Sequence, residues 1–198
     1  MRGDIGVFEN HPVVAQEYEL LAGDEPPDNL TVRELVKRVK ATKGVHSANC
    51  VVVQRPALLG AAACALLVSW MTTRLGDEEQ ATLNRAELEQ LIGGDAVREL
   101  HTAFASRVDL IRVRLVRAPG QVSFIKLHCD DALRTMQVAL NGEDEYDGGR
   151  LVFATDEGEL IQPSRVPGFA TVHDNTIVHG VSAITRGARF SLFFLTLA

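Results

Sequence analysis

Two histidines and one aspartate in the second half of the chain have the residue types of a metal site. His128 and Asp130 are separated by a single cysteine, and His179 follows further along the sequence. Two imidazoles and one carboxylate form the facial triad that binds iron(II) and leaves adjacent coordination positions open. A lone histidine in a strand is more often structural. This ordered set, followed by Arg189, instead predicts an iron(II) site.

The first two of these residues follow a stretch that is typical of a β-strand. Residues Val122–Leu127 are followed directly by His128, and successive side chains of a strand point to opposite faces. His128 and Asp130 are therefore expected on one face, so that a single strand offers two ligands to one ion. Cys129 and Asp131 are expected to point away, with Asp131 toward solvent.

The third ligand is expected from a hairpin near the C-terminus. The segment Thr171–Ala198 reads as two strands joined by a three-residue turn, Thr185–Gly187, with Gly187 in the left-handed conformation and Arg186 solvated at the tip. The predicted register pairs Ala183 with Arg189 and Val181 with Ser191.

This register has a chemical consequence. It puts His179, Arg189 and Ser191 on the same side, with the Cα atoms of His179 and Arg189 about 13 Å apart. An arginine that reaches back toward the metal leaves a gap suited to a short dicarboxylate. One end of that ligand would meet the metal and the other would pair with the guanidinium.

The stretch Val113–Ala198 carries further motifs around these residues. In chain order they are Arg117–Gln121, His128-Cys129-Asp130, Thr135, Leu140-Asn141, Tyr146–Phe153, Pro163, Gly168, His179–Val181 and Gly187–Leu192. Together they resemble the 2-oxoglutarate- and iron(II)-dependent dioxygenases, in the prolyl-4-hydroxylase-like branch. The resemblance implies a double-stranded β-helix, or jelly roll. It also implies a reaction in which 2-oxoglutarate and O2 yield succinate, CO2 and a hydroxylated product.

The same resemblance assigns roles to individual residues. His128, Asp130 and His179 would hold iron(II), and Arg189 would pair with the distal carboxylate of 2-oxoglutarate. Ser191 would add a hydrogen bond to that carboxylate. Ascorbate would serve as a reductant.

The chain departs from the family where tyrosines often surround 2-oxoglutarate. Ala118, Ile125 and Ala139 stand at the corresponding positions. Three explanations remain open: other groups take over, for which Thr135, Lys126 and Ser191 are the candidates, or affinity is reduced, or the cavity is enlarged for an unusual substrate. His173 and Asp174 are a second possible pair of metal ligands, but adjacent side chains of a strand diverge, so His173 is rather expected to line the pocket or to support a ligand. Arg150 is either a surface charge or a substrate contact.

Composition excludes several classes of protein. A formal net charge of −6 with no long basic run argues against a nucleic-acid footprint. Met1–Leu20 contains acidic residues and lacks the apolar core of a signal peptide. The most apolar stretch, Ala57–Met71, is shorter than the roughly 20 residues of a membrane span.

The cysteines indicate where the protein works. Cys50, Cys64 and Cys129 show no metal-type spacing and no disulfide framework. A cytoplasmic or other reducing intracellular compartment is therefore predicted.

The predicted organisation is α+β, with a jelly-roll core braced by N-terminal helices. Residues 1–28 read as an irregular acidic extension, and residues 29–198 as a single dioxygenase domain, with helical support over about 29–108 and the β-helix core over about 109–198. Thr31 with Glu34 makes a capping-box signature for the first helix. The other predicted elements are a strand at Val51–Val53, helices at Ala57–Arg74, Asn84–Ile92 and Asp95–Ala105, and a first core strand at Leu110–Val116.

The sequence leaves three alternative functions, each from a different functional class. The first is hydroxylation of a peptidyl side chain such as proline, the second is oxidation of a free amino acid or other small molecule, and the third is non-catalytic binding of metal and 2-oxoglutarate. The acidic loop Gly142–Gly149 either rims the entrance, which would favour a basic or polar substrate, or is a solvated turn. The sequence leaves the substrate and the oligomeric state open.

Overall fold

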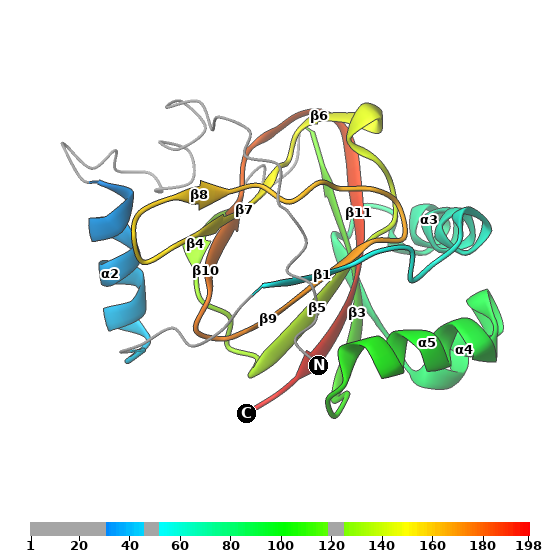
Figure 1. Cartoon of the computed structure of the whole chain (residues 1–198). Helices are drawn as coiled ribbons and strands as arrows, with labels where there is room; N and C mark the ends of the chain where they lie inside the picture. Colours follow the sequence, from blue (N-terminus) through cyan, green and yellow to red (C-terminus); the bar gives the residue numbers. More distant parts are fainter. Residues whose placement is uncertain (1–30, 46–51, 119–124) are drawn as a thin grey trace.

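Two antiparallel sheets face each other in the computed structural model (Figure 1), which describes residues 31–45, 52–118 and 125–198. The predicted extension over residues 1–28, together with Cys50 and Val51, lies outside these ranges. The larger sheet has the spatial order β1 (Val53–Arg55), β9 (Ala170–Asp174), β5 (Arg134–Ala139), β11 (Ile184–Thr196), β3 (Leu110–Arg117) and β2 (Gln80–Leu83), with β6 (Tyr146–Gly148) paired to the start of β11. The smaller sheet has the order β4 (Ile125–His128), β10 (Val178–Val181), β7 (Leu151–Ala154) and β8 (Leu160–Ile161).

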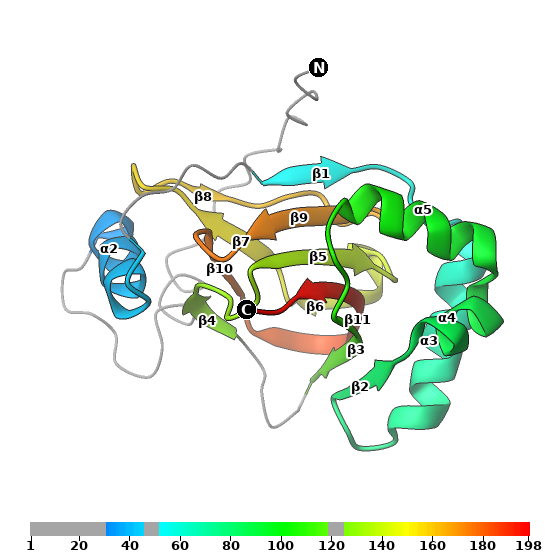
Figure 2. The same cartoon turned by 90° about the horizontal axis from the view of Figure 1, so that it is seen from below.

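Helices cover the outer face of each sheet. The helices α3 (Ala61–Leu75), α4 (Arg85–Ile92) and α5 (Gly94–Phe104) lie on the larger sheet, and α2 (Val32–Thr42) lies beside the smaller one, as Figures 1 and 2 show. The expected α+β jelly roll with supporting helices is therefore present. As predicted, Thr31 caps α2 in a capping box with Glu34. No helix in the described part of the chain is long and apolar enough to cross a membrane.

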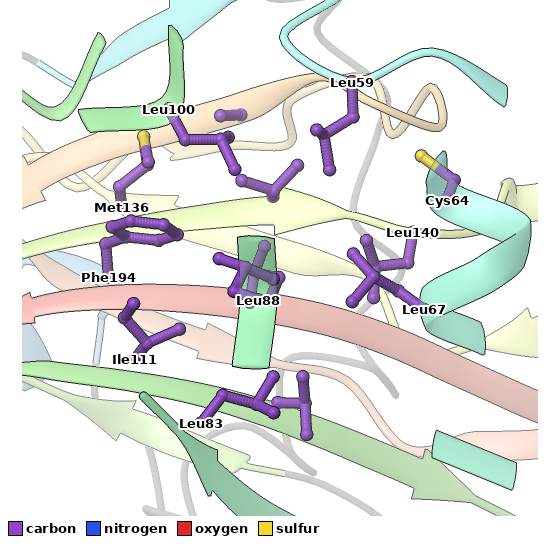
Figure 3. Packing of buried hydrophobic residues seen from close by; sticks show 14 of the residues in the cluster. Leu59, Cys64, Leu67, Leu83, Leu88, Leu100, Ile111, Met136, Leu140 and Phe194 are labelled. Atoms are coloured by element: carbon purple, nitrogen blue, oxygen red, sulfur yellow. The ribbon is translucent and has the colours of Figure 1, made fainter. Parts of the chain in front are cut away.

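Strand alternation separates the core from the site. On β5, Met136 and Val138 are fully buried in the cluster beneath the helices, which Figure 3 shows with Leu88 and Phe194. Burial of each such side chain contributes about 1.5–3 kcal/mol. Since neighbouring side chains point to opposite faces, Thr135, Gln137 and Ala139 are turned toward the space between the sheets.

The predicted C-terminal hairpin is wrong. Within the described residues, β10 pairs with β4 and β7, whereas β11 is one continuous strand that pairs with β6, β3 and β5. Ala183 therefore does not pair with Arg189, nor Val181 with Ser191. The chain crosses from the smaller to the larger sheet between β10 and β11, so His179 and Arg189 belong to different sheets.

Gly187 explains the error. Its φ of 77° is left-handed, as the turn reading required, but the glycine lies inside β11 opposite Tyr146, next to a register shift between Ile184 and Arg186. A Cβ at Gly187 would lie 2.4 Å from the carbonyl oxygen of Glu145. The left-handed glycine thus serves a bulge and a close approach of strands rather than a hairpin. Arg186 is exposed but ion-paired with Asp147.

Candidate metal centre

Pairing of β4 with β10 brings the two histidines together. His179 lies directly opposite His128, and the two ring centroids are 4.4 Å apart. Asp130 Oδ1 lies 3.4 Å from His128 Nε2 and 3.5 Å from His179 Nε2. The ligand atoms of these three residues all lie within 4.8 Å of one another. The structure thus gathers the three predicted ligands at one point.

The other ring nitrogen of each histidine contacts the backbone. His128 Nδ1 is 2.9 Å from the carbonyl oxygen of Lys126, and His179 Nδ1 is 3.2 Å from that of Ile177. A ring that donates from Nδ1 to a carbonyl keeps the lone pair of Nε2 available for a metal. Both Nε2 atoms face Asp130 Oδ1, so the donor set fits one divalent cation.

Burial and neighbouring groups shift the pKa values of the same three residues. Burial alone would raise the pKa of Asp130, but hydrogen bonds from His128 and His173 hold it well below its usual range. Burial, followed by the neighbouring His173, lowers the pKa of His179 to about 3. Burial also acts to lower the pKa of His128, yet the contact with Asp130 leaves it raised. Asp130 is thus anionic and His179 neutral at pH 7, the states that metal binding requires.

The sequence predicts that strand periodicity places Asp130 on the same face as His128, but the structure places it differently. β4 ends at His128, and Asp130 lies beyond it. Its side chain is instead held through Oδ2, which accepts hydrogen bonds from Thr135 Oγ1 at 2.5 Å and His173 Nε2 at 3.2 Å. These two contacts leave Oδ1 directed at the histidines. Thr135, predicted as a contact of 2-oxoglutarate, therefore orients the carboxylate of a candidate metal ligand in this structure.

Replacing His173 tests this support. His173 is 3% exposed, and its Nδ1 has no partner among the described residues, so Nε2 carries the proton that Asp130 accepts. His173→Ala is expected to weaken iron(II) binding about 10–100-fold, the usual effect of losing a partner of a metal ligand. His173→Gln, which keeps a donor, should retain most of the affinity. Competition with a chelator measures both, and unchanged affinity in His173→Ala would remove His173 from the site.

A cavity of about 540 Å³ adjoins the three ligands. Its inner wall includes Thr135 and Gln137 of the larger sheet, with Ile125, Leu151 and Val181 of the smaller one. None of the described residues Gly142–Gly149 lines it, so the acidic loop does not rim this cavity and Glu143–Glu145 are exposed. Asp131 faces solvent as predicted and pairs with Lys43.

Two buried arginines lie behind the inner wall. Arg189, 1% exposed, donates from Nη2 to Gln137 Oε1 at 3.0 Å and from Nη1 to Ser191 Oγ at 3.3 Å. Arg165 Nη2 donates to the same Ser191 Oγ at 3.1 Å and to the carbonyl oxygen of Phe190. The sequence reading missed Arg165, which lies between β8 and β9 and carries no motif. Only the tertiary fold brings it to Arg189.

This pair of cations lacks a counter-ion. Neither arginine forms an ion pair with a described residue, and the Nε atoms of both are buried without hydrogen-bond partners. Burial, then the charge of Arg165, lowers the pKa of Arg189 to about 9, and burial lowers that of Arg165. Buried charges of one sign are costly unless they are compensated. A carboxylate is the partner that fits them.

The spacing between the arginines and the metal ligands suits a short dicarboxylate. Thr135 contacts Asp130 and Gln137 contacts Arg189, and these two positions are two residues apart on β5. That separation corresponds to about 7 Å. One carboxylate at the metal ligands and a second at Arg189 would therefore bridge the gap, with Ser191 as a further donor.

The missing tyrosines are partly replaced from another strand. Ala139 is buried on β5, and Ile125 lines the cavity, so neither supplies a hydroxyl. Tyr146 of β6 is buried, and its ring and the Arg189 side chain both adjoin Gly149. The Tyr146 hydroxyl acts to raise the pKa values of Arg189 and Arg165 against the effect of burial, although no hydrogen bond of ordinary geometry joins it to a described residue. A phenol is thus available beside the arginines, although it comes from none of the three family positions.

The chain is similar in sequence to curated hydroxylases. Over 124 residues the chain is 31% identical to a PKHD-type hydroxylase of a Polaromonas species, covering 56% of this chain and 54% of that protein. A PKHD-type hydroxylase of Shewanella frigidimarina is 43% identical over 58 residues, 29% of this chain and 25% of that protein. The chain thus spans about half or less of the length of these curated relatives. No family model matches it.

Solved structures identify the fold. A prolyl-4-hydroxylase of Pseudomonas putida superposes with a TM-score of 0.56 at 17% identity, covering 82% of this chain and 99% of that chain. The iron- and 2-oxoglutarate-dependent epimerase SnoN of nogalamycin biosynthesis gives a TM-score of 0.53 at 18% identity, with 81% of each chain covered. The fold is the jelly roll of the 2-oxoglutarate- and iron(II)-dependent oxygenases. The resemblance to their prolyl-4-hydroxylase-like branch is thereby confirmed.

Proposed function

We propose that the chain is an iron(II)- and 2-oxoglutarate-dependent dioxygenase that hydroxylates a peptidyl side chain such as proline, releasing succinate and CO2. The observation that carries this proposal is the convergence of His128, Asp130 and His179 in front of the uncompensated pair Arg189 and Arg165. The similarity to PKHD-type hydroxylases and to a prolyl-4-hydroxylase supports it.

Each side chain has a task in this scheme. His128, Asp130 and His179 hold iron(II), while Thr135 and His173 fix the orientation of the Asp130 carboxylate. When bound, iron(II) and 2-oxoglutarate supply the oxidising chemistry, in which O2 and the oxidative decarboxylation of 2-oxoglutarate place an oxygen atom in a C–H bond.

The remaining residues orient 2-oxoglutarate and keep water out. Arg189, Arg165 and Ser191 bind its distal carboxylate, and Tyr146 offers a further hydroxyl. The apolar side chains Ile125, Leu151 and Val181 line the same cavity from the smaller sheet. Exclusion of water strengthens the charged contacts within such a site. Ascorbate would keep the iron reduced.

A small-molecule substrate is the second candidate. The cavity volume of about 540 Å³ lies within the roughly 300–1,000 Å³ of ligand pockets. One structural neighbour, SnoN, was solved with iron, 2-oxoglutarate and a nogalamycin compound. Oxidation of a free amino acid or another metabolite therefore remains open beside the peptidyl substrate. Non-catalytic binding is the third reading, and the complete set of ligand types argues against it.

We also propose a cellular compartment and a domain organisation for the protein. The buried thiols of Cys64 and Cys129 are both free, which supports a reducing intracellular compartment such as the cytoplasm. We assign residues 29–198 to one domain, with residues 1–28 as an extension.

Succinate formation tests the proposed activity. The protein is incubated in air with iron(II), ascorbate and 2-oxoglutarate, with and without proline-containing peptides and free amino acids. Wild type is expected to form succinate, and His128→Ala to form none above background. Binding of iron(II) and 2-oxoglutarate without succinate from any substrate would favour the non-catalytic reading. Absence of both binding and turnover would contradict the proposal.

A further inference from the structure

Two arginines face the cavity from β3 of the larger sheet, which lies between β11 and β2. On β3 the side chains of Ile111, Val113 and Leu115 are buried in the cluster beneath the helices. Because a strand alternates, Arg112 and Arg114 are turned to the opposite face. Both line the cavity that contains the metal ligands. The sequence reading gave neither residue a role.

These arginines lack partners within the described part of the chain. Neither makes an ion pair there, and the buried Nε of Arg114 has no hydrogen-bond partner. Glu79 attracts Arg114 from a distance, while burial and Arg112 act in the opposite sense, so the pKa of Arg114 is lowered. Of the other charged residues that line the cavity, Lys43 and Asp131 pair with each other, and Asp130 faces the histidines of the candidate metal site. The cavity therefore has uncompensated positive charge in a chain of net charge −6.

These two arginines lie on β3, beside the strand that carries Arg189, and in addition to burial the charge of Arg114 acts to lower the pKa of Arg189. In the β11–β3 register, Arg112 lies beside Phe193 and Arg114 beside Ser191. Phe193 in turn separates Arg112 from Gln137 on β5. The distal carboxylate of the cosubstrate already has Arg189 and Arg165. A second cationic pair on the other side of β11 is therefore available to another molecule.

The wall around Arg112 and Arg114 is otherwise apolar. Leu110, Phe193, Leu195 and Leu197 line the same part of the cavity. A ligand that matches this wall has an apolar body and an anionic group, since each arginine can pair with a carboxylate or phosphate in a fork geometry.

We propose that Arg112 and Arg114 are specificity-determining residues of the substrate site, and that the substrate carries a carboxylate or phosphate group. This inference rests on the proposed function and narrows its substrate class. It replaces the expectation of a basic substrate, which depended on an acidic loop that does not line the cavity.

Matched substrates that differ only in charge test the proposal. The first pair is the peptides Ac-Glu-Pro-Glu-NH2 and Ac-Gln-Pro-Gln-NH2. The second pair is the small molecules N-acetyl-L-proline and N-acetyl-L-prolinamide. Comparison of the two pairs distinguishes an acidic peptide substrate from a small acidic one. Substrate-stimulated succinate formation is measured for wild type and Arg112→Met/Arg114→Met. Arg85→Met/Arg98→Met, which removes the same charge from the exposed surfaces of α4 and α5, is the control.

We expect wild type to prefer the acidic member of at least one pair by about 10-fold or more, as one charge-assisted contact gives. The preference should fall to near unity in Arg112→Met/Arg114→Met and persist in the control. Equal use of both members of each pair by wild type would overturn the proposal. So would a double variant that raises the KM for 2-oxoglutarate while its substrate preference is unchanged.

A binding measurement separates this inference from the proposed activity. Calorimetric titration of the metal-free protein with Ac-Glu-Pro-Glu-NH2 needs no turnover. Tighter binding to wild type than to Arg112→Met/Arg114→Met, by about 10-fold, supports the anionic site even if no succinate is formed. Equal binding to both proteins contradicts it, whatever the activity.

Discussion

Replacing His179 by alanine is expected to remove high-affinity iron(II) binding. The substitution leaves two of the three candidate ligands, His128 and Asp130, and deletes the Nε2 atom that lies 3.5 Å from Asp130 Oδ1. Loss of a partner of a metal ligand typically costs 10–100-fold in affinity, and loss of the ligand itself should exceed this, at about 100-fold or more. Competition with a chelator, followed by calorimetry, gives the dissociation constant.

A second histidine provides the control for this variant. His101 of α5 packs edge-on against Phe194, with ring centroids 5.3 Å apart, outside the cavity of the metal ligands. His101→Ala is expected to lower the free energy of unfolding and to leave iron(II) affinity unchanged. Wild-type affinity in His179→Ala would show that the ligand assignment is wrong.

The ligand residues could be predicted from sequence because their chemistry is local. His128 and Asp130 are two residues apart, so any fold that orders this segment keeps them close. The partner of the pair, His179, was found from the order of the motifs. Its actual placement depends on pairing between β4 and β10, which period and turn signals did not predict.

Of the two residues that support the site, His173 could be predicted from the sequence and Arg165 could not. His173 was expected near the pocket because its adjacency to Asp174 suggested a ligand pair, while the divergence of neighbouring strand side chains favoured a supporting role for it. Arg165 was not expected, because a buried arginine has no sequence signature and loops rarely bury charge. Its burial makes sense only beside Arg189 and Ser191.

The hairpin error has a physical cause. A glycine with positive φ satisfies both a hairpin turn and a bulge inside a strand. Sequence shows that Gly187 can adopt the conformation, but long-range pairing with β6, β3 and β5 decides its use. Arg189 and Ser191 still share a face, because they are two residues apart on one strand. The shared face of Arg189 and Ser191 is therefore independent of the pairing register.

Replacing Arg189 by methionine is expected to have the largest effect on 2-oxoglutarate. Truncating one partner of a buried charged contact costs about 2–5 kcal/mol, so the KM and the dissociation constant for 2-oxoglutarate should rise about 30-fold to several thousand-fold. Arg189→Lys, which keeps the charge but loses the fork, should be intermediate. Iron(II) affinity should not change, since Arg189 contacts Gln137 and Ser191 rather than a metal ligand.

A neighbouring arginine of the same strand makes the comparison specific. Arg186 of β11 is exposed and paired with Asp147, so Arg186→Met should leave the KM for 2-oxoglutarate at the wild-type value. Arg165→Met should raise it less than Arg189→Met, by about 10-fold, because one guanidinium remains. An unchanged KM in Arg189→Met would mean that the distal carboxylate is bound elsewhere.

Stability distinguishes a binding role of Arg189 from a structural one. In the metal-free protein Arg189 and Arg165 are buried beside each other without a counter-ion. Replacing such a charge with an apolar side chain is often neutral or stabilising, so Arg189→Met should not lower the thermal midpoint of the ligand-free protein. A structural arginine would lower it. Unimpaired folding with lost 2-oxoglutarate binding would therefore show that the two arginines are kept together for their anionic ligand, at some cost to the stability of the empty site.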